Sequence, residues 1–268
     1  MSKFTFVGTG AADWPVSDKS FYKDFFTNRE ARMQQRKFSC AIYKDILIDC
    51  GKMAFELLCE QQQDFSKLSH IIITHSHPDH FDAFTLSQLC TRIFPVQLTI
   101  WGVKDLEVQL PVCKNLTFHC IECFKPFEIG AMRITAVPSN HWVVETGEQT
   151  VNFLIQDIEE DKTIFYGLDG AGIPIISWNE LSKYKYDLIV LECTTGCDEN
   201  DKRAFSHNNV TMVKILAGAL RAYKVLKPEG RIYVSHIAAT LHKSHKELQT
   251  QLNEIDVIVA QDGLCIEI

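Results

Sequence analysis

The chain has 268 residues, 46% of them apolar, with a formal net charge of −7 and an isoelectric point near 5.8. That length and apolar content suffice for one layered α/β enzyme, while the acidic balance argues against a general affinity for nucleic acid or anionic membranes. No N-terminal signal peptide is visible and no apolar run approaches the ~20 residues that cross a bilayer, so we expect a cytoplasmic protein without a membrane partner.

The first half of the chain alternates short apolar runs with segments of helical spacing. The expected strands are Lys3–Val7, Ala41–Tyr43, Ile46–Asp49, Ile71–Ile73 and Val96–Trp101, and the expected helices are Met53–Gln62 and Ala83–Ile93. A glycine turn, Gly8-Thr9-Gly10, follows the first strand. The long segment Ala11–Lys37 after this turn is expected to be irregular.

The second half repeats this style without repeating the sequence. The expected strands are Arg133–Val137, Val151–Gln156, Thr163–Tyr166, Leu188–Leu191, Arg231–Val234, Val257–Ala260 and Leu264–Ile268. A helix over Val210–Leu226 follows two capping candidates, Asn208 and Asn209, and Pro228-Glu229-Gly230 is expected to stop it. The last expected helix is Lys243–Asn253. No linker or composition shift divides the chain, so we expect one domain, 1–268, of two packed sheets with outer helices.

Ten cysteines in a chain without an export signal are expected to be reduced thiols. Cys120-Ile-Glu-Cys123 has the spacing of half a zinc site, but no second pair accompanies it. We therefore expect Cys113, Cys120 and Cys123 to lie in buried strands and loops as small apolar side chains.

One loop concentrates metal donors. His75, His77, Asp79 and His80 follow the strand at Ile71–Ile73 within six residues. Imidazoles bind zinc, manganese or iron, and carboxylates can bridge two ions. A lone histidine is often a hydrogen-bonded core residue, but four donors in one tight loop do not fit that interpretation. We predict a metal site here.

Three further donors also lie at or just after strand-like runs. His141 follows Ile134–Pro138 by a short turn, Asp169 follows Ile164–Leu168, and His236 follows Ile232–Ser235. Functional groups are often presented at strand ends. Each residue alone could equally be structural, and their shared placement favours a functional role for all three.

This set of residues resembles the metallo-β-lactamase-fold superfamily. The match is His75-x-His77-x-Asp79-His80, then His141, Asp169 and His236 in that order, and Gly8-Thr9-Gly10 and Ile48-Asp49-Cys50-Gly51 resemble further landmarks. The resemblance implies an α+β fold, the four-layer αβ/βα sandwich of two mixed β-sheets flanked by helices. It also implies two divalent ions per chain. His75, His77 and His141 would hold the first, Asp79, His80 and His236 the second, and Asp169 would bridge them.

A narrower resemblance is to the branch that contains phosphoribosyl cyclic phosphodiesterase and the tRNA 3′-processing endonuclease, tRNase Z. It rests on Pro138-Ser139-Asn140-His141, on Leu191-Glu192-Cys193 at a strand end, and on His207-Asn208-Asn209 before a long helix. The phosphodiesterase is the nearer relative because no segment resembles the tRNA-gripping arm. Members related to it often carry a cysteine cluster that binds a structural zinc, but 11–37 contains no cysteine. Its aromatic residues Trp14, Phe21, Tyr22, Phe25 and Phe26 could form a lid or could only pack the loop.

The resemblance implies a metal-dependent hydrolase, most simply a phosphodiesterase acting on a small or cyclic phosphodiester. Two ions would hold a bridging hydroxide that attacks phosphorus. Asp79 would help to orient it, and His207 would supply the proton to the leaving alkoxide. His207 could instead be a surface histidine. Lys202 and Arg203 could contact a phosphate or be solvated charges.

Other functions remain open on this sequence. A metal pair held by the same ligands could hydrolyse a lactone, ester or thioester, because the bridging hydroxide can attack a carbonyl carbon as readily as phosphorus. An RNA-processing endonuclease is disfavoured by the acidic chain, and a non-catalytic metal-binding module by the complete ligand set. Zinc is the expected metal, with manganese or iron as alternatives. The expected partner is a small-molecule phosphodiester rather than nucleic acid, and a homodimer is compatible with the resemblance.

Overall fold

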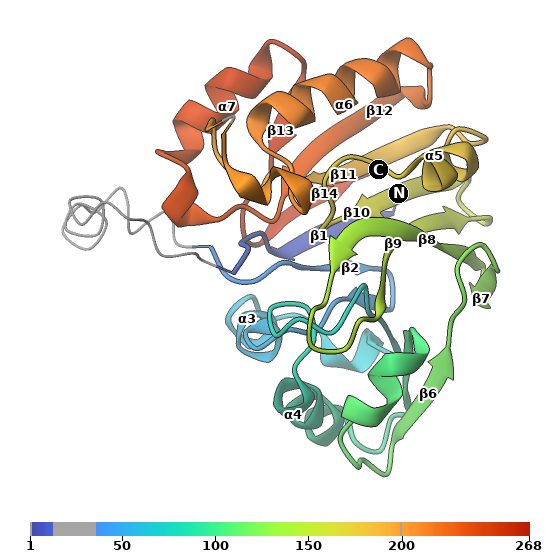
Figure 1. Ribbon diagram of the computed structural model, residues 1–268. Coiled ribbons are helices and arrows are strands. Elements are labelled where there is room, and N and C mark those ends of the chain that lie inside the picture. The colour runs from blue at the N-terminus through green and yellow to red at the C-terminus, as the bar shows by residue number, and fades with distance from the viewer. Residues whose placement is uncertain (1, 13–35, 199) are drawn as a thin grey trace.

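Two seven-stranded β-sheets face each other, and helices cover the outer side of each (Figure 1). This is a computed structural model that describes residues 2–12, 36–198 and 200–268. The aromatic residues considered as a lid, between Trp14 and Phe26, lie outside these ranges. The arrangement is the mixed two-sheet α+β sandwich that the sequence predicts.

The first sheet has the order β14-β1-β2-β3-β4-β5-β6. Its strands are β1 (Lys3–Gly8), β2 (Cys40–Tyr43), β3 (Ile46–Ile48), β4 (His70–Ile72), β5 (Leu98–Gly102), β6 (Leu116–Cys120) and β14 (Leu264–Glu267). Neighbours from β3 to β6 are parallel, and the others are antiparallel.

The second sheet has the order β13-β12-β11-β10-β9-β8-β7. Its strands are β7 (Phe127–Ile129), β8 (Met132–Trp142), β9 (Gln149–Asp157), β10 (Lys162–Gly167), β11 (Tyr186–Glu192), β12 (Leu226–Ser235) and β13 (Val257–Val259). The strands from β10 to β13 are parallel. Each sheet therefore has one parallel half whose strands end at a common edge.

The helices are α3 (Ala54–Glu60), α4 (Ala83–Ile93), α5 (Ile175–Leu181), α6 (Val210–Ala222) and α7 (His245–Asn253), with short 3-10 helices at Phe65–Lys67, Lys104–Gln109, Lys202–Phe205 and Ala239–Leu241. Side-chain caps start three of the α-helices: Asp82 accepts from the Thr85 N–H, Asn209 from Met212 and Ser244 from Glu247. Within the described ranges, no helix combines the length and apolar character needed to cross a membrane.

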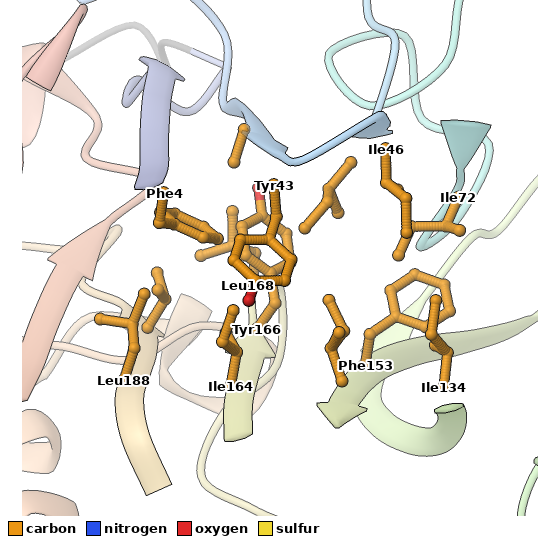
Figure 2. Close-up of a cluster of buried hydrophobic side chains, with 14 of the residues drawn as sticks. Phe4, Tyr43, Ile46, Ile72, Ile134, Phe153, Ile164, Tyr166, Leu168 and Leu188 are labelled. Carbon is orange, nitrogen blue, oxygen red and sulfur yellow. The ribbon is translucent and has the colours of Figure 1, made fainter. Parts of the chain in front are cut away.

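Three apolar clusters produce the four layers. The central cluster fills the space between the sheets (Figure 2), with Phe4, Tyr43, Ile46 and Ile72 from the first sheet and Ile134, Phe153, Ile164, Tyr166 and Leu188 from the second. A second cluster joins the second sheet to α5, α6 and α7, and a third joins the first sheet to α3 and α4. Strands such as β3 and β11 are buried on both faces, which is why their sequences are continuous apolar runs.

The structure corrects several predicted boundaries. The helix expected over Val210–Leu226 ends at Ala222, because Lys224 adopts a left-handed conformation and Leu226 pairs with Tyr186 at the start of β12. Pro228-Glu229-Gly230 therefore lies inside β12, at an irregularity in its pairing, rather than at the end of a helix. β6, β7 and α5 were not predicted. Cys120 is exposed, so the burial expected for it was wrong. Cys113 and Cys123 are only half-buried, and both pack against apolar clusters.

A buried carboxylate joins the two sheets at the end of β9, where Asp157 pairs with Lys162 at the start of β10. Asp157 Oδ2 accepts a hydrogen bond of 2.7 Å from the Tyr43 hydroxyl and forms an ion pair with Lys44. Burial alone would raise the pKa of the Asp157 carboxyl, but Lys44 and Tyr43 together hold this pKa below its ordinary value. Its contribution to stability is therefore present above the unfolded-state pKa, near 4, and is lost as the pH falls through the lower folded-state pKa.

We expect Asp157→Asn to lower the free energy of unfolding at pH 7 by roughly 1–3 kcal/mol, the typical cost of losing a charged hydrogen-bond partner. The difference from wild type should narrow below about pH 4, where the wild-type carboxyl also begins to lose its charge. Urea unfolding at pH 7, 5 and 3.5 measures this. Glu159→Gln, an exposed change in the same turn, is the control. A difference for Asp157→Asn that is constant across this range would contradict the assignment.

Candidate metal centre

The predicted donors converge where the parallel strands end. His75, His77, Asp79 and His80 lie in the loop after β4, Asp169 follows β10 and His236 follows β12. His141 lies within β8, inside the irregular stretch between Pro138 and Trp142, and not after a separate turn as the sequence suggested. The loop after β4 is held close to β3: Cys50 N–H donates to His80 O, and a Cβ at Gly51 would lie 2.0 Å from Asp79 O.

The first group of donors contains three imidazoles and one carboxylate. His77 Nδ1 lies 2.9 Å from His75 Nε2 and 3.1 Å from His141 Nε2. Asp169 Oδ2 completes the group at 3.2 Å from His75 Nε2 and 3.5 Å from His141 Nε2. All four ligand atoms lie within 4.8 Å of one another.

The second group contains two imidazoles and two carboxylates. His80 Nε2 lies 3.1 Å from His236 Nε2, 3.2 Å from Asp169 Oδ2 and 3.6 Å from Asp79 Oδ2. His236 Nε2 lies 3.4 Å from the same Asp79 oxygen. Asp169 Oδ2 therefore belongs to both groups, which is the placement required of a bridging ligand.

The spacing of these atoms fits divalent metal ions. Ligand bonds of 2.0–2.1 Å in a tetrahedral site place donor atoms about 3.3 Å apart, and the distances within the two groups are 2.9–3.6 Å. Apart from the carboxylates, the groups consist of imidazole nitrogens turned toward one another. Neutral imidazoles offer lone pairs to a cation in this arrangement.

Hydrogen bonds to the other ring nitrogens fix four of the imidazoles. The partners are Asp49 Oδ2 for His80 Nδ1 (2.8 Å), Thr194 Oγ1 for His236 Nδ1 (2.8 Å), Thr74 Oγ1 for His75 Nδ1 (3.0 Å) and Ser206 O for His141 Nδ1 (3.3 Å). Such partners orient metal-binding histidines and set their tautomer. The Thr74 N–H also donates to Asp49, so one carboxylate holds both the strand end and the ring.

The local electrostatics favour a cation. Burial lowers the pKa of His75 and His141. At His80 and His236 the nearby carboxylates, Asp169 foremost, outweigh burial and raise the pKa, to about 9 for His236. The same imidazoles hold the pKa of Asp169 below its ordinary value although burial would raise it. The carboxylates therefore favour positive charge at His80 and His236, and they would favour a bound metal cation in the same way.

Three residues of this region have left-handed backbone conformations, with φ of 64° at Asp49, 52° at Asp169 and 53° at His236. Outside glycine this conformation is uncommon, and asparagine and aspartate tolerate it best. Its repeated occurrence at strand ends turns each side chain toward the centre. Strain of this kind is concentrated at functional sites.

His207 is buried beside the two groups rather than on the surface, which was the alternative considered for it. Its Nδ1 lies 3.1 Å from Glu192 Oε1 and 3.6 Å from Asp169 Oδ1. Glu192 is fully buried at the end of β11, where it also accepts the N–H groups of Gly170 and Thr194. Although burial lowers the pKa of His207, the Glu192 and Asp169 carboxylates together outweigh it, so the net shift is upward.

Other candidates lie outside the centre. Lys202 is exposed, and the Arg203 guanidinium is bound to Asp201. His242 is buried, with Nε2 2.9 Å from Cys193 O. No role was assigned to Asp49 or Thr194 from the sequence, although both hold metal-donor imidazoles. The only indication for either residue was that Asp49 lies in Ile48-Asp49-Cys50-Gly51, a segment that resembles the superfamily.

The description "Beta-lactamase superfamily domain" belongs to a family model that matches residues 44–237, more than half of the chain. Three solved structures share the fold. The metallo-beta-lactamase fold protein YhfI from Bacillus subtilis is 20% identical with a TM-score of 0.72, and the match covers 99% of this chain and 98% of that one. A diphosphatase from the PhnP family is 18% identical with a TM-score of 0.75 (100% of this chain and 98% of that one), and human short-form tRNase Z, ELAC1, is 19% identical with a TM-score of 0.67 (99% of each chain). At these identities the likeness establishes the fold alone. Comparison with curated proteins gives no significant sequence match.

Proposed function

The chain belongs to the metallo-β-lactamase superfamily, and from that premise we propose that it is a two-metal phosphodiesterase acting on a small or cyclic phosphodiester. The superfamily membership supports a metal-dependent hydrolase. The number of ions, their identity and the phosphodiester substrate belong to the proposal. Zinc is the proposed metal because the donors are imidazoles and carboxylates at tetrahedral spacing.

The observation that carries the proposal is the buried Glu192–His207 pair. Hydrolysis of a phosphodiester expels an alkoxide, which needs a proton. An ester or lactone also expels an alkoxide, so the preference for phosphorus rests on His207 lying in the segment that resembles the phosphodiesterase branch. His207 lies beside both donor groups, with its ring centroid 4.8 Å from that of His141 and 6.0 Å from that of His236, which supports its assignment as the proton donor. Two of the similar structures, a diphosphatase and a tRNase Z, have names that also refer to phosphate or RNA chemistry.

Each residue has a defined task in this proposal. Two divalent ions, when bound, supply an activated water and positive charge for the phosphoryl oxygens. Asp79 presents Oδ2 to the second group, where the Ala12 N–H also donates to it at 3.2 Å, and its other oxygen is assigned to orienting the attacking water. Glu192 holds His207 through Nδ1, so that Nε2 is the ring nitrogen assigned to protonate the leaving oxygen.

Elemental analysis of the purified protein combined with a substrate panel tests this function. The panel contains a bis-aryl phosphate, cyclic nucleotides, lactones and thioesters, each assayed with the native metal content and after metal removal by a chelator. We expect about two ions per chain and chelator-sensitive hydrolysis of phosphodiesters. Activity restricted to lactones or thioesters would replace the phosphodiesterase with the carbonyl hydrolase, and inactivity throughout would indicate a metal-binding module.

A further inference from the structure

The turn between β8 and β9 places a buried carboxylate against the metal-donor loop. Glu148 is 2% exposed, and its Oε1 accepts a hydrogen bond from the Ser76 N–H. Ser76 stands between His75 and His77, two donors of the first group. In Figure 1 this turn extends from the second sheet toward the loops of the first, so the contact links the two sheets.

The residues that follow Glu148 hold the rest of the first group. Thr150 Oγ1 donates to His141 O at 2.9 Å, and Val151 N–H donates to Thr74 O at 3.1 Å. One short stretch, from Glu148 to Val151, is therefore bonded to the backbone beside all three imidazoles of that group. In the second group, the two imidazoles are held instead by Asp49, at His80, and by Thr194, at His236.

Only one of the two carboxyl oxygens of Glu148 has a hydrogen-bond partner among the described residues. Its Oε2 is buried without a hydrogen bond, and no ion pair to Glu148 is found, within the described residues. A buried unpaired carboxylate is costly unless a cation lies near it. The two groups differ in this respect: the second has Asp79 and Asp169, whereas the first has only the carboxylate that it shares. Glu148 would add the second negative charge near the first group.

We propose that Glu148 is a positioning residue for the first group, holding the turn at Ser76 and favouring a divalent ion among His75, His77 and His141. This rests on the metal-binding part of the proposed function. It does not depend on which substrate is hydrolysed. Glu148 does not itself contact a ligand atom of that group; it acts through the backbone of the donor loop and through its charge.

The test is a metal titration of the metal-free protein against a chromophoric chelator, with zinc and then cobalt(II), whose absorption spectrum reports coordination. Glu148→Ala should weaken binding of one ion by roughly 10–100-fold, as expected for loss of an outer partner of metal ligands. Glu148→Gln keeps an acceptor for Ser76 but removes the charge, so a smaller loss is expected. Glu145→Gln, an exposed change of the same chemistry in the same turn, should titrate like wild type.

A second background identifies which ion is affected. His77→Ala removes a ligand of the first group only, so it should retain one tightly bound ion. Adding Glu148→Ala to His77→Ala should leave the affinity for that remaining ion unchanged. A further loss there would overturn the proposal, because Glu148 would then act on the whole centre.

The Gln variant is close in shape to the wild type, so it keeps the test decisive if the Ala variant fails to fold. If both Glu148 variants bound the two ions with wild-type affinity, the proposal would be wrong, and Glu148 would only pack the turn. A wild-type protein that binds two ions, shows the Glu148 effect and hydrolyses no phosphodiester would refute the proposed function while upholding this inference.

Discussion

Asp169→Asn is expected to remove both metal ions under conditions in which the wild type retains them, and to reduce hydrolysis to background. Loss of an outer partner of a metal ligand costs roughly 10–100-fold in affinity. Asp169 Oδ2 lies in both donor groups, so its loss should exceed about 100-fold for each ion. Asparagine is the informative replacement because it keeps the shape and tolerates the left-handed backbone at this position, where φ is 52°. Elemental analysis and chelator competition measure the effect.

Asp49→Asn provides a matched comparison. Asp49 is also buried and left-handed, but it contacts His80 only through Nδ1 and belongs to neither donor group. Its replacement should weaken the second ion more than the first and by less than Asp169→Asn weakens either. Equal losses of metal affinity in the two variants would mean that the negative charge near the centre determines metal binding and that bridging by Asp169 does not. Retention of two ions by Asp169→Asn would exclude Asp169 as a shared ligand.

The donor loop after β4 was predictable because its signal is local. Four donors lie within six residues after a strand. Asp169 and His236 follow strand-like runs, but each alone could equally be structural, and the order of the residues in the family resemblance added them to the set. The fold followed from the same runs, since parallel strands buried on both faces require helices outside them. The boundaries of the elements were predicted less well. Helix propensity predicted that the helix beginning at Val210 continues to Leu226, but Leu226 pairs with Tyr186 as the first residue of β12.

The residues that support the donors could not be predicted in this way. Ser76 and Glu148 are 72 residues apart, and Thr194 and His236 are 42 apart, so nothing in either neighbourhood signals the contact. Threonine and glutamate are also common in loops and turns without any function. Glu192 was found only through a family resemblance, because a glutamate at a strand end has no chemical signature until His207 is placed beside it.

His207→Ala is expected to lower kcat by roughly 10²–10⁴-fold, the usual contribution of a positioned acid, while metal content stays at the wild-type level. The Glu192 carboxylate raises the pKa of His207 against the effect of burial and so favours the protonated ring that an acid requires. Divalent ions nearby would lower the pKa of His207, so the opposing charge of Glu192 would be needed to keep the ring protonated. Glu192→Gln should therefore also lower kcat and should shift the alkaline limb of the pH–rate profile to lower pH. Steady-state kinetics from pH 5 to 10 measure both effects.

The leaving group separates acid catalysis from a merely structural role. A nitrophenolate departs without a proton, whereas an alkoxide needs one, so the loss in His207→Ala should be much larger for alkyl than for nitrophenyl phosphodiesters. A packing defect would slow both substrates alike. His119→Ala, on the edge strand β6 outside the centre, should change neither rate. If His207→Ala hydrolysed the alkyl phosphodiester at the wild-type rate, the proton would have to come from elsewhere, and the main argument for phosphodiester over carbonyl chemistry would be lost.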